Sequence, residues 1–172
     1  MAQHVTRSLM LLVWAIMLPG LSLAASATAT FNVSATVTAT CTISAASLSF
    51  GSYEPVLTNA TVPLDVNGSV TVRCTKGTTA TIGLDQGSHA ASGSTTTTPL
   101  RQMINDMSLL RYDLFRTAAG TDVWGDIGTP NVQSYSATNN SPQTLTVFGR
   151  IPAAQDVATG SYSDTVTATI NF

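Results

Sequence analysis

The sequence has 172 residues, and only 9% of them are Asp, Glu, Lys or Arg, against about 25% in a typical soluble domain. The formal net charge is −2 and the basic residues are scattered, which excludes the clustered basic surface that a nucleic-acid partner requires. The length suffices for one domain, and a surface with so little charge favours packing against copies of itself, because self-repulsion is low.

Residues 1–24 have the pattern of a signal peptide. His4 and Arg7 lie in a short polar region, residues 9–18 are uninterruptedly apolar, and Pro19 follows them. A membrane anchor is the alternative, but a span needs about 20 apolar residues. Small residues place the cleavage site after Ala24 or Ala27. We therefore expect an exported protein.

Apolar and polar residues alternate without interruption over residues 27–44, which is eighteen positions (44 − 27 + 1). In an extended strand all the apolar side chains then share one face. At roughly 3.3 Å per residue this face is about 60 Å long, more than one domain of this size covers by itself. We expect residues 25–38 to be a donor strand that pairs with the sheet of another subunit. The expected donor side chains are Ala29, Phe31, Val33, Ala35 and Val37.

Two alternatives to a donor strand remain for this segment. It is compatible with a disordered linker, and also with an ordinary first strand of the domain.

The two cysteines, Cys41 and Cys74, are 33 positions apart (74 − 41). Export through an oxidising compartment predicts that they form a disulfide rather than two free thiols. A loop of this length would stabilise the fold by roughly 3–4 kcal/mol.

Residues 39–172 show further runs with a period of two residues and few helix signals. Turn residues such as Asn67-Gly68 separate these runs. Short strands at this spacing predict an all-β sandwich of two sheets. The runs lie within residues 70–74, 80–84, 110–114, 145–149 and 166–172.

No residue pattern predicts catalysis. His89, the one histidine after residue 24, lies in a Gly/Ser-rich loop, and we expect it to be solvated rather than part of a catalytic triad. Arg150 and Asp164 are expected to form a structural ion pair or to cap turns. We expect no catalytic, cofactor-binding or metal-binding residue, and no cofactor.

An ordered set of short motifs resembles spore coat protein U and the archaic, Csu-type chaperone–usher pilins. The aromatic C-terminus and the spacing of the cysteines belong to the same pattern. The motifs are Phe31-x-Val33, Cys41-Thr42-Ile43, Leu48-Ser49-Phe50-Gly51, Val70-x-Val72-x-Cys74, Gly83-Leu84-Asp85-x-Gly87, Arg101-x-Met103, Leu110-x-Tyr112-x-Leu114-Phe115, Leu145-Thr146-Val147-Phe148-Gly149-Arg150-Ile151 and Gly160-x-Tyr162-x-Asp164-Thr165-Val166.

The resemblance implies an incomplete immunoglobulin-like β-sandwich that a donor strand from another subunit completes. The implied partners are a periplasmic chaperone, an outer-membrane usher, and other copies or related subunits. The implied function is a structural subunit of a surface fibre or coat that supports adhesion or biofilm formation. A secreted binding module, either a tip adhesin or a carbohydrate-binding sandwich, is the alternative. The expected groove residues are Val166, Ala168, Ile170 and Phe172.

Overall fold

The computed structural model describes residues 24–172. The predicted signal peptide therefore lies, apart from Ala24, outside the described residues. No helix in the described part of the chain is long and apolar enough to span a membrane. The structure divides into two units, the first ending at Thr36 and the second running from Val37 to Phe172. Each unit is described by itself.

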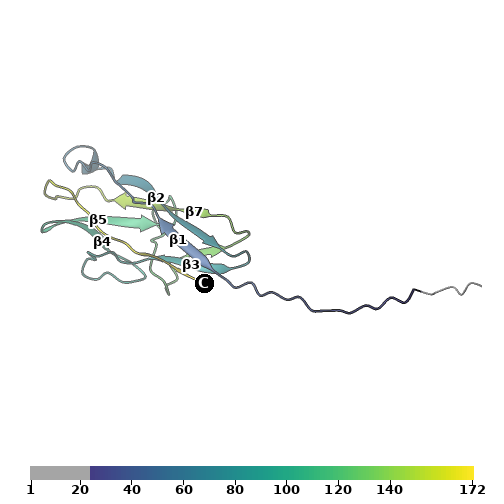
Figure 1. Cartoon of the computed structure of the whole chain (residues 1–172). Helices are drawn as coiled ribbons and strands as arrows, with labels where there is room; N and C mark the ends of the chain where they lie inside the picture. The colour runs from purple at the N-terminus through teal and green to yellow at the C-terminus, as the bar shows by residue number, and fades with distance from the viewer. Residues whose placement is uncertain (1–23) are drawn as a thin grey trace, which may run out of the picture. The chain divides into compact units, whose positions relative to one another are not determined.

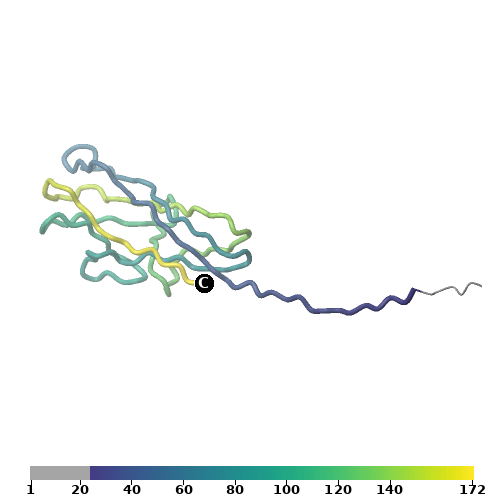
Figure 2. The backbone as a smooth tube through the Cα atoms, in the orientation of Figure 1, coloured from purple at the N-terminus to yellow at the C-terminus, as the bar shows by residue number. Residues whose placement is uncertain are grey.

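The described part of the first unit, residues 24–36, is exposed at every position and has no assigned strand or helix. In Figure 2 this purple segment follows an extended path. Its alternating side chains therefore have no partner within the segment itself.

The second unit consists of two β-sheets, which confirms the predicted all-β class (Figure 1). The five-stranded sheet has the order β1-β2-β7-β5-β4, and the three-stranded sheet has the order β6-β3-β8. The elements in chain order are β1 (Cys41–Ala45), a 3-10 turn η1 (Thr58–Ala60), β2 (Leu64–Cys74), β3 (Thr79–Leu84), β4 (Arg101–Asn105), β5 (Ser108–Phe115), β6 (Gln133–Ser136), β7 (Gln143–Ile151) and β8 (Ala168–Asn171).

The core forms where the inward faces of these strands meet. Trp124 is fully buried, and its indole N–H donates to the carbonyl of Ile82 at 2.8 Å. Burial of one Val, Leu or Ile side chain is worth about 1.5–3 kcal/mol, so each inward-facing residue of the alternating runs contributes to stability. The buried core cluster comprises Val70, Val72, Ile82, Leu84, Leu110, Tyr112, Leu114, Trp124, Val147 and Ile151.

A buried arginine joins the two sheets. Arg101 of β4 is fully buried. Its Nε donates to the carbonyl of Asp85, and its Nη2 donates to the carbonyls of Leu84 and Trp124, each at 2.8 Å. Burial lowers the pKa of Arg101 from its ordinary value, because desolvation disfavours the charged form.

The predicted turn at Asn67-Gly68 is wrong, because these residues lie inside β2 and pair there with Phe148 and Val147. Gly68 is needed for packing rather than for a turn, because a Cβ atom at this position would lie 2.9 Å from Cδ1 of Leu48.

Candidate functional site

The site lies where one edge of each sheet has no partner strand. Within the described residues, β1 pairs with β2 alone and β8 pairs with β3 alone. The two strands nevertheless lie near one another, and Figure 2 shows the yellow C-terminal segment running beside the blue segment that contains β1. Each strand therefore presents unpaired backbone N–H and C=O groups along the same gap.

A cavity of about 470 Å³ occupies this gap. Its apolar lining comes from the core side of both sheets and from the stretch that follows β1. The lining residues are Ala45, Ala46, Ser47, Leu48, Phe50, Gly68, Ser69, Val70, Leu84, Met103, Tyr112, Leu114, Val147, Tyr162, Ser163, Asp164, Thr165, Val166 and Ala168. We call this cavity the groove.

The four expected groove residues have different environments. Val166 and Ala168 line the groove. Ile170 packs partly buried against the core, opposite Ile82 of β3. Phe172 is 55% exposed and borders a separate hollow with Tyr135 and its neighbours on β3 and β6. The structure thus brings two of the four residues together in the groove.

The segment before β8 is held by a carboxylate in addition to backbone hydrogen bonds at Ser163, Thr165 and Thr167. Asp164 Oδ2 accepts a hydrogen bond from the hydroxyl of Tyr112 at 2.6 Å. Asp164 Oδ1 accepts from the backbone N–H of Ser88 and contacts Nδ1 of His89, each at 3.0 Å. The Asp164 side chain is only 2% exposed. This carboxylate fixes one wall of the groove.

These contacts correct two expectations from the sequence. His89 is half-buried against Asp164 instead of solvated. Arg150 does not pair with Asp164; its Nε and Nη2 donate to the Asp65 carboxylate at 2.6 and 2.8 Å. The reason is register, since Asp65 of β2 lies directly opposite Arg150 of β7.

Tyr112 is held in its neutral form. Burial raises the pKa of Tyr112 well above its ordinary value, and the hydrogen bond to the Asp164 carboxylate raises it further. Both effects act in the same direction because an ionised phenol would be desolvated and would face a carboxylate. Tyr112 therefore remains a hydrogen-bond donor to Asp164.

A second carboxylate supports the same segment. Asp85 Oδ1 accepts from the backbone N–H groups of Gly87 and Thr167, each at 2.9 Å. Gly87 has φ = +76°, and a Cβ atom there would lie 2.2 Å from Oδ2 of Asp164. Gly87 thus allows the loop after β3 to approach the groove wall closely. This loop leads from one sheet to the other, since β3 and β4 belong to different sheets.

The expected donor residues all lie in exposed backbone without regular secondary structure. Phe31 is 85% exposed, and Val33 and Val37 are exposed to a similar degree. Ala29 and Ala35 are exposed as well. A row of exposed apolar side chains on one segment, unlike a single one, is typical of an interaction site.

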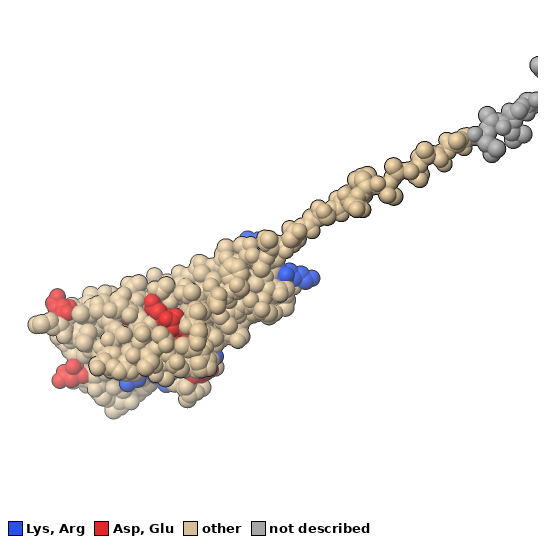
Figure 3. All heavy atoms as spheres, turned by 90° about the horizontal axis from the view of Figure 1, so that it is seen from below, with Lys and Arg blue, Asp and Glu red and all other residues tan. Residues whose placement is uncertain are grey.

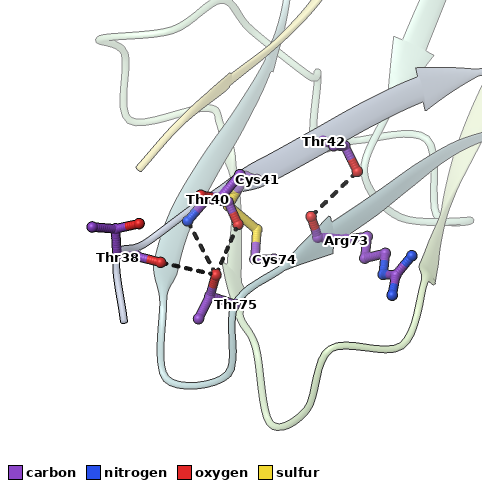
Figure 4. The surroundings of a disulfide bond; sticks show 7 residues. All are labelled: Thr38, Thr40, Cys41, Thr42, Arg73, Cys74 and Thr75. Atoms are coloured by element: carbon purple, nitrogen blue, oxygen red, sulfur yellow. Dashed lines mark hydrogen bonds between the residues drawn. A yellow bond between two sulfur atoms is a disulfide. The ribbon is translucent and has the colours of Figure 1, made fainter. Parts of the chain in front are cut away.

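The predicted disulfide is confirmed (Figure 4). Cys41 and Cys74 are directly opposite one another on β1 and β2, with their Cα atoms 4.1 Å apart. Thr75 adds further contacts: its backbone N–H donates to the carbonyl of Thr40 at 2.9 Å, and its hydroxyl donates to the carbonyl of Thr38 at 3.3 Å. The start of β1 is therefore fastened to the end of β2.

Several groove residues were missed by reasoning from periodicity. Leu48, Phe50, Met103 and Tyr162 lie outside the alternating runs, in loops or in a short strand. The motif Leu48-Ser49-Phe50-Gly51 was the signal that would have found two of them. Within residues 24–172, the His, Cys, Asp and Glu side chains form no group of three or more that could hold a metal ion.

Comparison with known proteins shows which protein family the chain is related to. A family model described as the spore coat protein U domain matches residues 27–169. A curated protein of Myxococcus xanthus, named Protein U, is 38% identical over 130 residues, which cover 73% of this chain and 72% of that protein.

Two solved structures are similar in fold. One is a crystal structure of the CsuC–CsuE chaperone–tip adhesion subunit pre-assembly complex from the archaic chaperone–usher Csu pili of Acinetobacter baumannii; it matches with a TM-score of 0.57 and 26% identity over 80% of this chain. The match spans only 40% of that solved chain. The other is the P pilus rod subunit PapA, with a TM-score of 0.49, 17% identity, and coverage of 76% of this chain and 97% of that one.

The family model covers 143 of the 172 residues (169 − 27 + 1). It includes β1 to β7 and most of the groove wall, together with both cysteines. The chain therefore belongs to the spore coat protein U domain family.

Proposed function

We propose that this chain is an exported structural subunit of a chaperone–usher fibre or coat on the cell surface. In this proposal residues 25–38 of one copy fill the groove of another, where they lie between β1 and β8. The observation that carries the proposal is the pair of unpaired edges at β1 and β8 with an apolar cavity of about 470 Å³ between them. A donor strand supplies backbone hydrogen-bond partners to the two edges and apolar side chains to the cavity.

The donor segment has the side chains that such a cavity accepts. Phe31, Val33 and Val37 share one face of an extended strand, and burial of each is worth about 1.5–3 kcal/mol, with less for each alanine. Backbone hydrogen bonds to both neighbouring strands add to this energy. Such a joint opens slowly, so the polymer is kinetically stable.

The open groove also explains the partners that we propose. A subunit with an exposed apolar cavity and two free strand edges aggregates unless it is covered. A periplasmic chaperone covers the groove until an outer-membrane usher exchanges it for the next subunit's donor strand. The similarity to a subunit solved in a chaperone pre-assembly complex supports this assignment. Adhesion and biofilm formation are the proposed roles of the finished fibre.

The test is to place a carboxylate on the donor face. Phe31→Asp or Val33→Asp would bury an unpaired charge in the neighbouring copy's groove, which is costly. We expect normal amounts of the periplasmic chaperone complex but few or no fibres at the surface. Asn32→Asp and Ser34→Asp are the matched controls, because they put the same charge on the polar face of the same strand.

Loss of the soluble chaperone complex in the Phe31→Asp variant, through degradation, would contradict the proposal. The segment would then belong to the subunit's own core as an ordinary first strand.

A further inference from the structure

Apart from the terminal carboxylate of Phe172, which lies where β8 ends, the exposed charged side chains that have no ion-pair partner are separated to opposite ends of the second unit. Among the described residues, Arg150, Arg111 and Arg116 are paired with Asp65, Asp113 and Asp122, and Arg101 is buried. Arg73 and Lys76 are exposed and have no acidic partner. Three acidic residues are likewise exposed and unpaired, namely Glu54, Asp106 and Asp156.

Strand register shows that these two sets lie at opposite ends. Cys41 is opposite Cys74, and Lys76 lies in the turn after it, so this end carries Arg73 and Lys76. We call it the base end. The other ends of β2 and β7 meet where Leu64 pairs with Ile151. We call this the loop end, because it carries residues 46–63, the β4–β5 turn and residues 152–161.

The three acidic residues occupy loops that hydrogen bonds join to one another at the loop end. The backbone N–H of Gln155, next to Asp156, donates to the hydroxyl of Tyr53, next to Glu54, at 3.0 Å. The β4–β5 turn, which contains Asp106, is joined to residues 158–162 by a hydrogen bond from the backbone N–H of Ala158 to Oγ of Ser108 at 3.2 Å. Figure 3 shows acidic side chains at one end of the domain and basic side chains at the other, with further acidic and basic side chains between the two ends.

Exposed apolar side chains accompany the acidic residues at the loop end. Met107, beside Asp106, is 96% exposed, and Val56 and Leu57, close to Glu54, are also largely exposed. In a chain of which only 9% is charged, an end that combines three unpaired carboxylates with three open apolar side chains has the composition of an interface with a basic partner.

We propose that the loop end of each subunit docks on the base end of the next copy of the same chain. This inference rests on the proposed donor-strand function and goes beyond it, because it assigns a second contact between neighbours outside the groove. Glu54, Asp106 and Asp156 of one copy face Arg73 and Lys76 of its neighbour. The contact is heterologous, so it repeats from copy to copy and builds an open fibre when the rotation between copies does not close a ring.

Strand direction supports this pairing of ends. β1 runs away from the base end, whereas β8 runs toward it, because Ala168 pairs with Leu84 and Asn171 with Thr81. A donor strand that is antiparallel to β8 runs from the base end to the loop end of the receiving copy. The domain that follows this strand in the donating copy starts at its own base end, so that base end meets the loop end of the receiving copy. The opposite direction would bring two base ends together, with Arg73 and Lys76 facing like charges. Charge therefore selects the antiparallel direction.

Lys76 is the only lysine in the chain. Its amine can therefore be used in a zero-length crosslinking experiment. Assembled fibres are treated with a carbodiimide, which links amines to carboxylates in contact, and the linked peptides are identified by mass spectrometry. We expect links from Lys76 to Glu54, Asp106 or Asp156. Mixed fibres of isotope-labelled and unlabelled copies should contain links between the two kinds of copy. Lys76→Arg is the matched control, since it keeps the charge but removes the reactive amine, and it should form fibres without such links.

A second measurement uses charge reversal. Arg73→Glu with Lys76→Glu should leave the yield of chaperone complex unchanged and lower the initial polymerisation rate about 10-fold at low salt. Adding Glu54→Lys, Asp106→Lys and Asp156→Lys to the same chain should restore the rate, because the two ends are again complementary.

The outcomes separate this contact from the function on which it rests. Fibres that form normally, but in which Lys76 links only to other carboxylates such as that of Phe172, or to none, would overturn the docking contact and leave donor-strand assembly in place. An unchanged rate in the charge-reversed variant would do the same. Absence of polymers from the unaltered chain would overturn both proposals.

Discussion

Tyr112 donates its hydroxyl hydrogen to Oδ2 of Asp164 at 2.6 Å, so that a side chain of β5 holds the segment that precedes β8. Both groups line the groove. The segment itself has little regular pairing, apart from an isolated bridge between Ile104 and Ser163. Backbone hydrogen bonds also reach Thr165 and Thr167. The side-chain hydrogen bonds of the groove wall add to them, and single substitutions can test their contribution.

Stability is best compared in a strand-completed monomer. In this variant a second copy of residues 27–40 follows Phe172 through a short flexible linker, so that each molecule carries a donor for its own groove. All four predictions that follow use unfolding of this monomer.

Tyr112→Phe should lower the free energy of unfolding by about 1.5–3 kcal/mol, because it removes a buried hydrogen bond to a charged group. Urea denaturation of the strand-completed monomer measures the change. Tyr135→Phe is the matched control, since no hydrogen bond from the Tyr135 hydroxyl is present among the described residues. A difference between the two variants of less than about 0.5 kcal/mol would show that the Tyr112–Asp164 contact does not hold the groove wall.

Gly87→Ala should destabilise the monomer more than Gly93→Ala does. Both glycines have positive φ, +76° and +83°, so each substitution carries the same backbone cost of about 1–2 kcal/mol. Only at Gly87 does the new Cβ meet another group, Oδ2 of Asp164 at 2.2 Å, whereas Gly93 has open space. Thermal unfolding should rank the variants in this order, and equal losses would argue against the close approach.

Replacement of both cysteines, Cys41→Ser with Cys74→Ser, should cost roughly 3–4 kcal/mol of unfolding free energy, because the unfolded chain is no longer constrained. Non-reducing peptide mapping of the exported protein should find the two cysteine peptides linked. Free thiols in the folded protein would contradict this assignment.

Asp65→Asn should make the protein less sensitive to acid. The hydrogen bond from Arg150 holds the pKa of Asp65 below its ordinary value of 3.8. A lowered pKa in the folded state gives stability that is present above pH 3.8 and is lost as the pH falls through the folded-state pKa. The ion pair is exposed, so the loss at pH 7 should stay below about 1 kcal/mol. Melting temperatures at pH 7, 4 and 2.5 should therefore converge for the two proteins toward low pH.

Alternation in the sequence predicted those strands that have one face on the core. The runs around Val72, Ile82, Leu114 and Val147 all became strands, because a period of two residues leaves no other way to bury their apolar side chains. β4 and β6 were missed. β4 contains the buried Arg101, whose side chain donates hydrogen bonds to three carbonyl groups. Because arginine is charged, this buried position does not extend a pattern of alternating apolar residues.

The groove was only partly predictable. Val166 and Ala168, which the family resemblance implied as groove residues, line the groove, whereas Phe172, implied on the same ground, borders a separate hollow. Asp164 was recognised as structural but was given the wrong partner. Its neighbours Tyr112, Ser88 and His89 come from chain segments about 50 to 76 positions away, a proximity that only the folded arrangement of the two sheets creates.

The disulfide has a mechanical consequence in the proposed fibre. A pull along such a fibre reaches each domain through the residues just before Cys41. The hydrogen bonds of β1 would have to bear this load alone, and β1 has only five residues. The covalent link to Cys74 instead transfers the load at the first residue of β1 directly to the end of β2, which is an eleven-residue strand paired on both sides. Tension thus bypasses β1, a short strand beside the groove. The groove that holds the neighbouring subunit's donor strand therefore keeps its shape while the proposed fibre is stretched.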